Sequence, residues 1–264
     1  VFDGLHKGHQ KIAELTDFIL TLHPHPKEVL TNKPIRYLTT PKELTKLHPN
    51  TIILPFTKQI SSLTADQFLE LLLKKLNPKK IVAGYDYRFG NQRKGTLSLL
   101  KGWGKKHKIK IQEVQPISYK NTIVKSSTIR TLIQNNEFNK ALPYLGHPYL
   151  IQGPVIHGSG RGKSLGFPTA NIQINQKKLL PTNGVYKAYT YLNDTNYPCV
   201  VNIGTNPTFN EQQQKIEVHI PTINQDLYKT ELTLFLTKKI REEKKFKNTD
   251  TLIEQIKKDL QTLA

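Results

Sequence analysis

The spacing of apolar segments changes character once along the chain, and this change limits the folds that the sequence can adopt. In the first half, short apolar runs alternate with segments that carry helix signals. This alternation predicts an α/β unit with a parallel sheet, because each helix returns the chain to begin a strand in the same direction. The strand-like runs are 17–22, 51–56, 81–83 and 109–114, and the helix signals include 64–76 and 98–107.

The second half contains short apolar runs separated by turns, which predicts a small antiparallel β-barrel with a terminal helix from Asp250. A helix over 137–145 ends at Gly146, and Pro148 follows it as a stop signal. We therefore expect two domains, 1–146 and 147–264. The expected strands are 149–152, 155–157, 186–192, 200–203, 216–220 and 233–236, and the expected turns are 158–162, 183–184 and 206–207.

Composition narrows the classes of partner. The chain of 264 residues has a net charge of +19, from 39 lysines and arginines against 20 acidic residues. The lysines are scattered and no basic motif is interleaved with aromatic residues, which favours a solvated basic surface over a nucleic-acid site. No apolar run approaches the roughly 20 residues of a membrane span. We expect neither nucleic acid nor a membrane as partner, and a homo-oligomer stays open.

Two further features concern the compartment and the extent of the chain. Cys199 is the sole cysteine, so the chain forms no internal disulfide and suits a reducing cytoplasm. The sequence contains no methionine and begins inside a motif, from which we expect that it omits residues.

The opening residues contain the first candidate site. His6 and His9 flank Gly8 where an apolar-periodic run begins, so both imidazoles should lie on one face of a helix start. The N–H groups of a helix start attract phosphate, and Gly8 lets a phosphate approach the backbone. The alternative is a polar turn with two solvated histidines. A zinc site is less favoured, because no third ligand lies nearby.

Two later segments of the first half also suit nucleotide binding. Gly84 and Asp86 belong to a glycine-bracketed loop that could approach a nucleotide and accept a hydrogen bond from it, although the aromatic residues of this loop could equally be core. A second segment places hydroxyls and a guanidinium at a helix start, where they could bind phosphate or simply cap the helix. Its candidate residues are Ser126, Ser127, Thr128 and Arg130.

The loop over 157–166 is rich in glycine and cations, so its backbone N–H groups could cradle phosphate. Thr169 and Asn171 follow on an extended segment, where alternation should point both to one side. Their oxygens suit Mg²⁺ that bridges phosphates. A glycine-rich loop by itself is more often a flexible turn. The candidate phosphate-binding residues of this loop are Gly158, Gly160, Gly162 and Lys163.

These motifs, in this order, resemble those of bifunctional riboflavin kinase/FAD synthetases. Phe-Asp-Gly-x-His-x-Gly-His at 2–9 resembles the ATP-binding signature of the nucleotidylyltransferase superfamily, with the prefix of its FAD synthetase branch. Leu-Gly-Phe-Pro-Thr-Ala-Asn at 165–171 resembles the riboflavin kinase module. The resemblance implies a Rossmann-like nucleotidylyltransferase domain with a parallel sheet, followed by a riboflavin kinase-like antiparallel barrel with a terminal helix.

The resemblance also implies substrates and residue roles. ATP would phosphorylate riboflavin to FMN in the barrel and adenylylate FMN to FAD in the first domain, with Mg²⁺ in both steps. Glu217 would be the general base of the kinase step. His6, His9 and Arg130 would act in adenylylation, and Asp3 would belong to its ATP site. The implied flavin-binding residues are His25, Phe167 and Asn202.

Departures from the family pattern leave two rival interpretations open. The truncated start, the short first crossover and the missing spacer before Ile129 leave open an active kinase with a vestigial adenylyltransferase half. The charge of +19 leaves open a non-enzymatic flavin- or RNA-binding protein. The completeness of the kinase motif argues against that second rival.

Overall fold

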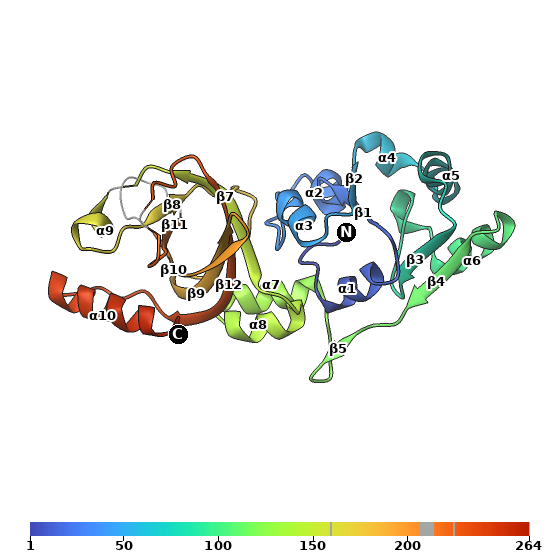
Figure 1. Cartoon of the computed structure of the whole chain (residues 1–264). Coiled ribbons are helices and arrows are strands. Elements are labelled where there is room, and N and C mark those ends of the chain that lie inside the picture. The colour runs from blue at the N-terminus through green and yellow to red at the C-terminus, as the bar shows by residue number, and fades with distance from the viewer. Residues whose placement is uncertain (159, 206–213, 224, 264) are drawn as a thin grey trace. The chain divides into compact units, whose positions relative to one another are not determined.

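The computed structural model describes residues 1–158, 160–205, 214–223 and 225–263 (Figure 1). The chain forms two compact units, Val1–Ser126 and Ser127–Ala264. The domain boundary expected between 146 and 147 stays a prediction, because the helices that precede it lie in the second of these units.

Two parallel strand pairs form the main sheets of the first unit, which also contains one short antiparallel pair. β1 (Ile19–His23) pairs in parallel with β2 (Thr51–Pro55), and β3 (Lys80–Gly84) pairs in parallel with β4 (Lys110–Val114). Parallel pairs need a crossover connection, which the intervening helices provide. The predicted α/β unit with parallel strands is confirmed, and within the described residues the pairing forms separate two-stranded sheets.

Polar side chains at the helix starts explain where several helices of the first unit begin. Thr64 caps α5 in a capping box with Gln67, and Thr40 caps α3 in the same way with Glu43. The elements of this unit are α1 (Lys7–Ala13), α2 (Pro26–Thr31), α3 (Pro41–Leu47), α4 (Lys58–Ser62), α5 (Ala65–Leu76), the short turn η1 (Asn91–Arg93), α6 (Leu97–Lys106), β5 (Ser118–Tyr119) and β6 (Thr122–Ile123).

The main core of the first unit forms where α5 and α6 pack over β3. Phe68, Leu69, Ala83, Leu100 and Trp103 are buried together there. Burial of a large apolar side chain stabilises a fold by about 1.5–3 kcal/mol, so this cluster holds β3 and the loop that follows it in place.

The second unit is built on a closed antiparallel barrel, with its described strands in the order β10-β11-β8-β7-β12-β9. Alternate residues of each strand point into the core, as in the pattern of β9, which confirms the predicted barrel. The strands are β7 (Tyr149–Ile156), β8 (Ala170–Ile172), β9 (Gly184–Leu192), β10 (Thr195–Thr205), β11 (Gln214–His219) and β12 (Glu231–Arg241).

Two details expected of the barrel are wrong. The runs 149–152 and 155–157 form the single strand β7, because Pro154 stays in the ladder opposite Glu231 and its carbonyl accepts a hydrogen bond from Gln173 N at 3.0 Å. The turn expected over 158–162 runs into a short helix, α9 (Arg161–Ser164). The turn expected at 206–207 lies outside the described residues.

Three longer helices complete the second unit: α7 (Ser126–Gln134), α8 (Phe138–Leu145) and α10 (Thr249–Gln261). Gly146 ends α8 with a φ of 79°, as the sequence predicts. α10 begins one residue before the expected Asp250, because Asn248 caps it. Within the part of the chain that the structure describes, no helix has the length and hydropathy needed to cross a membrane.

Candidate active sites

A row of polar side chains crosses three strands of the barrel. Asn171 of β8 is the direct partner of Glu217 of β11, and Glu217 is the direct partner of Asn202 of β10. Directly opposed residues on one face of an antiparallel sheet have Cβ atoms about 5 Å apart. The strand register therefore brings together three residues that are 31 and 15 positions apart in the sequence and that the sequence assigned to different roles.

Strand alternation keeps this row out of the barrel core. Ile216 and Val218 flank Glu217 and are buried. Val201 and Ile203 flank Asn202 and are also buried. Since neighbouring strand residues point to opposite faces, the three polar side chains lie on the outer face of the barrel wall. There a substrate can reach them.

Two glycines of the glycine-rich loop over 157–166, which we call the glycine loop, lie directly against the predicted metal ligands. A side chain built at Gly158 would overlap the amide of Asn171, and one built at Gly162 would come within 3.1 Å of Thr169 Oγ1. Thr169 and Asn171 thus both face this loop, as alternation predicts. Gly160 has a φ of 71°, which favours glycine. The side chain of Lys163, a predicted phosphate ligand, lies outside the described part of the structure.

The carboxylate of Glu217 is available for chemistry. Within the described ranges, it has no hydrogen bond or ion pair to another residue, although the chain carries 39 basic residues. A carboxylate held between two amide side chains can accept a proton without first leaving a salt bridge. Phe167, a predicted flavin contact, lies at the end of the same site, where its N–H donates to Gly162 O at 2.8 Å.

In the first unit, the two histidines of the opening motif are stacked. His6 is the N-cap of α1, and its Nδ1 accepts a hydrogen bond from His9 N at 3.4 Å. The two rings lie 3.6 Å apart at an angle of 16°. The predicted placement on one face of a helix start is confirmed. Gly8 lies beside them, where a Cβ would come within 3.3 Å of the His6 ring, which is a tight contact.

His9 is held neutral, and one of its ring nitrogens is buried. Burial, assisted by the neighbouring His6, lowers the pKa of His9 well below 6.5. Its Nδ1 is buried and has no hydrogen-bond partner among the described residues. A buried polar atom without a partner is costly in a finished structure, so its position suits a polar ligand.

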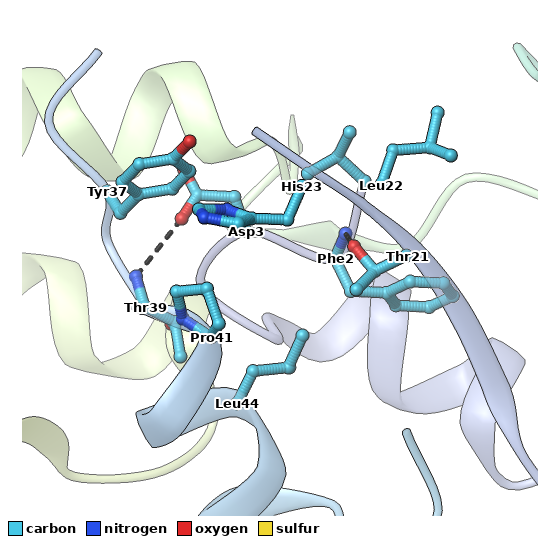
Figure 2. A pocket seen from close by; sticks show the side chains of 10 residues that line it. Phe2, Asp3, Thr21, Leu22, His23, Tyr37, Thr39, Pro41 and Leu44 are labelled. Carbon is cyan, nitrogen blue, oxygen red and sulfur yellow. Dashed lines mark hydrogen bonds between the residues drawn. The ribbon is translucent and has the colours of Figure 1, made fainter. Parts of the chain in front are cut away.

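Asp3 connects the opening motif to two other segments. Its Oδ1 accepts a hydrogen bond from Thr39 N at 3.0 Å, and its backbone carbonyl accepts one from Ser126 Oγ at 2.8 Å. Figure 2 shows Asp3, His23 and Tyr37 side by side in a pocket at the carboxyl end of β1. Open α/β sheets bind ligands at this end of their strands.

The structure adds Tyr37 and Thr39 to this region, which sequence reasoning missed. Tyr37 Oη accepts a hydrogen bond from His25 N at 2.9 Å and donates one to Glu28 Oε2 at 2.9 Å. Burial raises the pKa of Tyr37 to about 12, so this hydroxyl stays protonated and continues to donate. It fixes the loop of His25, whose own side chain caps α2.

The loop after β3 contains both packed aromatic residues and an exposed carboxylate. Phe89 is buried and Tyr87 stacks on it with ring centres 5.4 Å apart, so its aromatic residues are core, which is the alternative that the sequence left open. Gly84 lies beside α1, because a Cβ there would meet Ile12 Cδ1 at 3.7 Å, and Asp86 is exposed. The remaining candidates, Ser127, Thr128 and Arg130, follow Ser126 on α7 in the second unit.

Comparisons with known proteins match both halves of the chain. A family model described as FAD synthetase matches residues 1–128, and one described as riboflavin kinase matches residues 145–264. The bifunctional riboflavin kinase/FMN adenylyltransferase of Bacillus subtilis is 37% identical over 98% of this chain and 88% of its own length. The protein of the same name from Buchnera aphidicola of Schizaphis graminum is 36% identical over 98% and 90%.

A solved structure matches the fold of the whole chain. It is titled as a macrolide-efflux protein from Streptococcus pneumoniae, and it superposes with a TM-score of 0.84 at 30% identity, over 99% of this chain and 91% of that chain.

Proposed function

Because the chain belongs to the family of bifunctional riboflavin kinase/FMN adenylyltransferases, we propose that it phosphorylates riboflavin to FMN in the barrel unit and adenylylates FMN to FAD through the motif of the first unit. ATP is the second substrate of both reactions. The observation that carries the proposal is the row of Asn171, Glu217 and Asn202, with Gly158 of the glycine loop against its Asn171 end.

In the kinase step, Glu217 accepts the proton of the riboflavin 5′-hydroxyl. The oxygen forms a bond to the γ-phosphorus of ATP, the bond from that phosphorus to the β-phosphate oxygen breaks, and FMN and ADP result. The lack of a partner for the Glu217 carboxylate among the residues that the structure describes supports this role. Asn202, beside it, would orient the ribityl chain, and the backbone N–H groups of the loop that contains Gly158 and Gly162, on the Asn171 side, would bind the phosphates.

Mg²⁺ is part of the proposal for this site. The Thr169 hydroxyl and the Asn171 side-chain carbonyl are hard oxygen donors that face the same glycine loop, so they fit this cation. When bound, Mg²⁺ neutralises charge on the phosphate oxygens. Thr169 and Asn171 would hold it beside Glu217, and Lys163 is proposed to contact the phosphates directly.

In the adenylylation step, a phosphate oxygen of FMN attacks the α-phosphorus of ATP and pyrophosphate leaves. The FMN phosphate is already anionic, so the step needs positioning and charge stabilisation and no base. His6 and His9 would donate hydrogen bonds to phosphate oxygens. His9 Nδ1, which has no hydrogen-bond partner in the described part of the chain, supports this role.

Other residues would complete this site. We assign the ATP phosphates and ribose to Asp3, Gly8, Gly84, Asp86 and Ser126, and FMN to His25. Ser127, Thr128 and Arg130 are assigned to the phosphates on the resemblance of their segment alone.

The chemistry also suggests where the protein acts and what it does not bind. A single buried cysteine suits the reducing cytoplasm that we propose as its location. We propose that nucleic acid is no partner. Binding of RNA that weakens steeply with salt would contradict this.

A time course with purified protein tests the proposed function. Riboflavin, ATP and Mg²⁺ should give FMN first and FAD later, and supplied FMN should give FAD without a delay. If riboflavin stays unchanged, the kinase proposal is wrong. FMN that accumulates without FAD would support the rival in which the first unit is vestigial.

A further inference from the structure

His219 ties the segment that carries Thr169 to the strand that carries Glu217. Its Nδ1 lies 2.8 Å from the carbonyl oxygen of Pro168. A carbonyl oxygen only accepts, so this ring nitrogen bears the proton and donates. The ring also meets Phe167 edge to face, with centres 5.7 Å apart at 78°.

This hydrogen bond lies where the backbone ladder between the two strands ends. The pairing of β8 with β11 starts with Ala170 opposite Val218, and His219 is the next residue of β11. Continued by one step, the register would place Thr169 opposite His219, and Pro168, which has no N–H to donate to a ladder, comes one residue before Thr169. The imidazole of His219 adds a hydrogen bond to the carbonyl of Pro168 just beyond the last pair of this ladder.

Thr169 is consequently held from both sides. Pro168 before it is fixed by His219, and Ala170 after it is fixed by the ladder. The glycine loop is linked to the same segment, because Phe167 N donates a hydrogen bond to Gly162 O at 2.8 Å. Movement of Pro168 would therefore displace the Thr169 hydroxyl and the loop together, relative to Glu217.

We propose that His219 is a positioning residue for the phosphoryl transfer. It keeps the phosphate-binding side of the site, at Thr169, in register with the base on the adjacent strand. His219 lies two residues from Glu217 on the same face of β11, so it acts through the backbone of Pro168 and does not need to touch the reacting atoms. The inference rests on the proposed kinase function.

Three variants of His219 distinguish the effect of its hydrogen bond from the effect of the size of its ring. The amide nitrogen of His219→Asn can take the place of Nδ1, the amide of His219→Gln reaches the position of Nε2 instead, and His219→Ala removes both. FMN formation is measured with each, and conversion of supplied FMN to FAD is the internal control. Exchange of the backbone amides of Thr169 and Ala170, followed by mass spectrometry, reports the tether without any turnover.

The inference predicts that His219→Ala lowers kcat for FMN formation by about 10- to 100-fold, because a displacement of about 1 Å can cost 10²-fold. His219→Asn should restore most of the rate and the amide protection, and His219→Gln should restore neither. FAD formation from FMN should not change. Equal rates and equal protection in all three variants would overturn the inference, and so would equal loss with Asn and Gln.

The same experiment keeps the two proposals apart. A wild-type protein that makes no FMN would reject the kinase function, whatever the variants do. In that case the amide protection still decides whether His219 holds the segment, and protection that is unchanged in His219→Ala would reject the tether as well.

Discussion

Glu217 and Asn171 face each other directly across the antiparallel strands β11 and β8. The arrangement puts a carboxylate with no described partner next to an amide that the glycine loop covers. Phosphoryl transfer needs the base and the phosphate site in a fixed relation. Here the strand register fixes that relation, which is a more rigid support than a loop.

Gly158→Ala should impair the kinase step. The added methyl group would overlap the Asn171 amide, and overpacking of this kind costs about 1–3 kcal/mol. We expect kcat/KM for FMN formation to fall by about tenfold or more, because the overlap displaces the predicted metal ligand Asn171 and a misplacement of about 1 Å can cost 10²-fold in rate. Steady-state kinetics with ATP as the varied substrate measures the effect.

Gly102→Ala is the matched control for that variant. Gly102 lies in α6 and a Cβ there meets nothing within 4 Å. Because alanine favours a helix over glycine by about 1 kcal/mol, this variant should keep both activities and unfold at the same or a higher temperature. A loss with Gly102→Ala equal to that with Gly158→Ala would mean that the steric argument is wrong.

His6→Ser should lower FAD formation and leave FMN formation unchanged. Serine is a good N-cap and would keep the N-terminus of α1 capped, but its short side chain cannot extend to a phosphate as the His6 imidazole can. Loss of one donor to a developing charge costs about 10²–10³-fold in kcat. Chromatography of the flavins measures both rates in one sample. A proportional loss of both products would argue against separate sites.

Acid should weaken the first unit through His9. The folded pKa of His9 lies well below the ordinary 6.5, because its ring is buried, so the unfolded chain takes up the proton first. Its contribution to stability is complete above pH 6.5 and is lost as the pH falls from 6.5 toward the folded pKa. Urea unfolding of wild type and His9→Gln between pH 7 and pH 5 should show a smaller acid loss in the variant. Parallel pH curves would contradict this account.

Asp259→Ala should destabilise the barrel unit. Asp259 accepts from Arg241 Nη2 at 2.7 Å and from Arg241 Nε at 2.9 Å, and it is 3% exposed. Removing one partner of a buried ion pair costs about 3–5 kcal/mol. The unfolding free energy of this unit, measured in urea, should fall by that amount.

The exposed pair of Lys11 and Glu14 is the comparison for this effect. Both side chains are at least half exposed. Glu14→Ala should therefore change the unfolding free energy of the first unit by less than about 1 kcal/mol. If the two acidic residues gave equal losses, burial would not be the cause.

Local signals in the sequence predict much of the fold. The strand–helix alternation, the cap at Thr64 and the stop at Gly146 all depend on neighbouring residues, and the structure confirms them. The Thr-Pro-x-Glu pattern at 40–43 is an equally good helix start signal that sequence reasoning did not use.

The candidate sites depend on non-local contacts that no local pattern determines. Alternation predicts that Thr169 and Asn171 share a side, but the partner of Asn171 is set by the register of β8 and β11. In the same way, Tyr37 reaches His25 only through the fold of the intervening loop. A hydroxyl that bonds to a backbone N–H twelve residues away leaves no periodic signal in the sequence.

The central claim is that Glu217, within its row of amides, is the base of riboflavin phosphorylation. The most direct measurement is FMN formation by Glu217→Gln, with conversion of supplied FMN to FAD in the same preparation as the control. Loss of a general base costs about 10²–10⁴-fold, so we expect FMN formation to fall by that factor while FAD formation stays at the wild-type rate. A variant that phosphorylates riboflavin at the wild-type rate would contradict the claim.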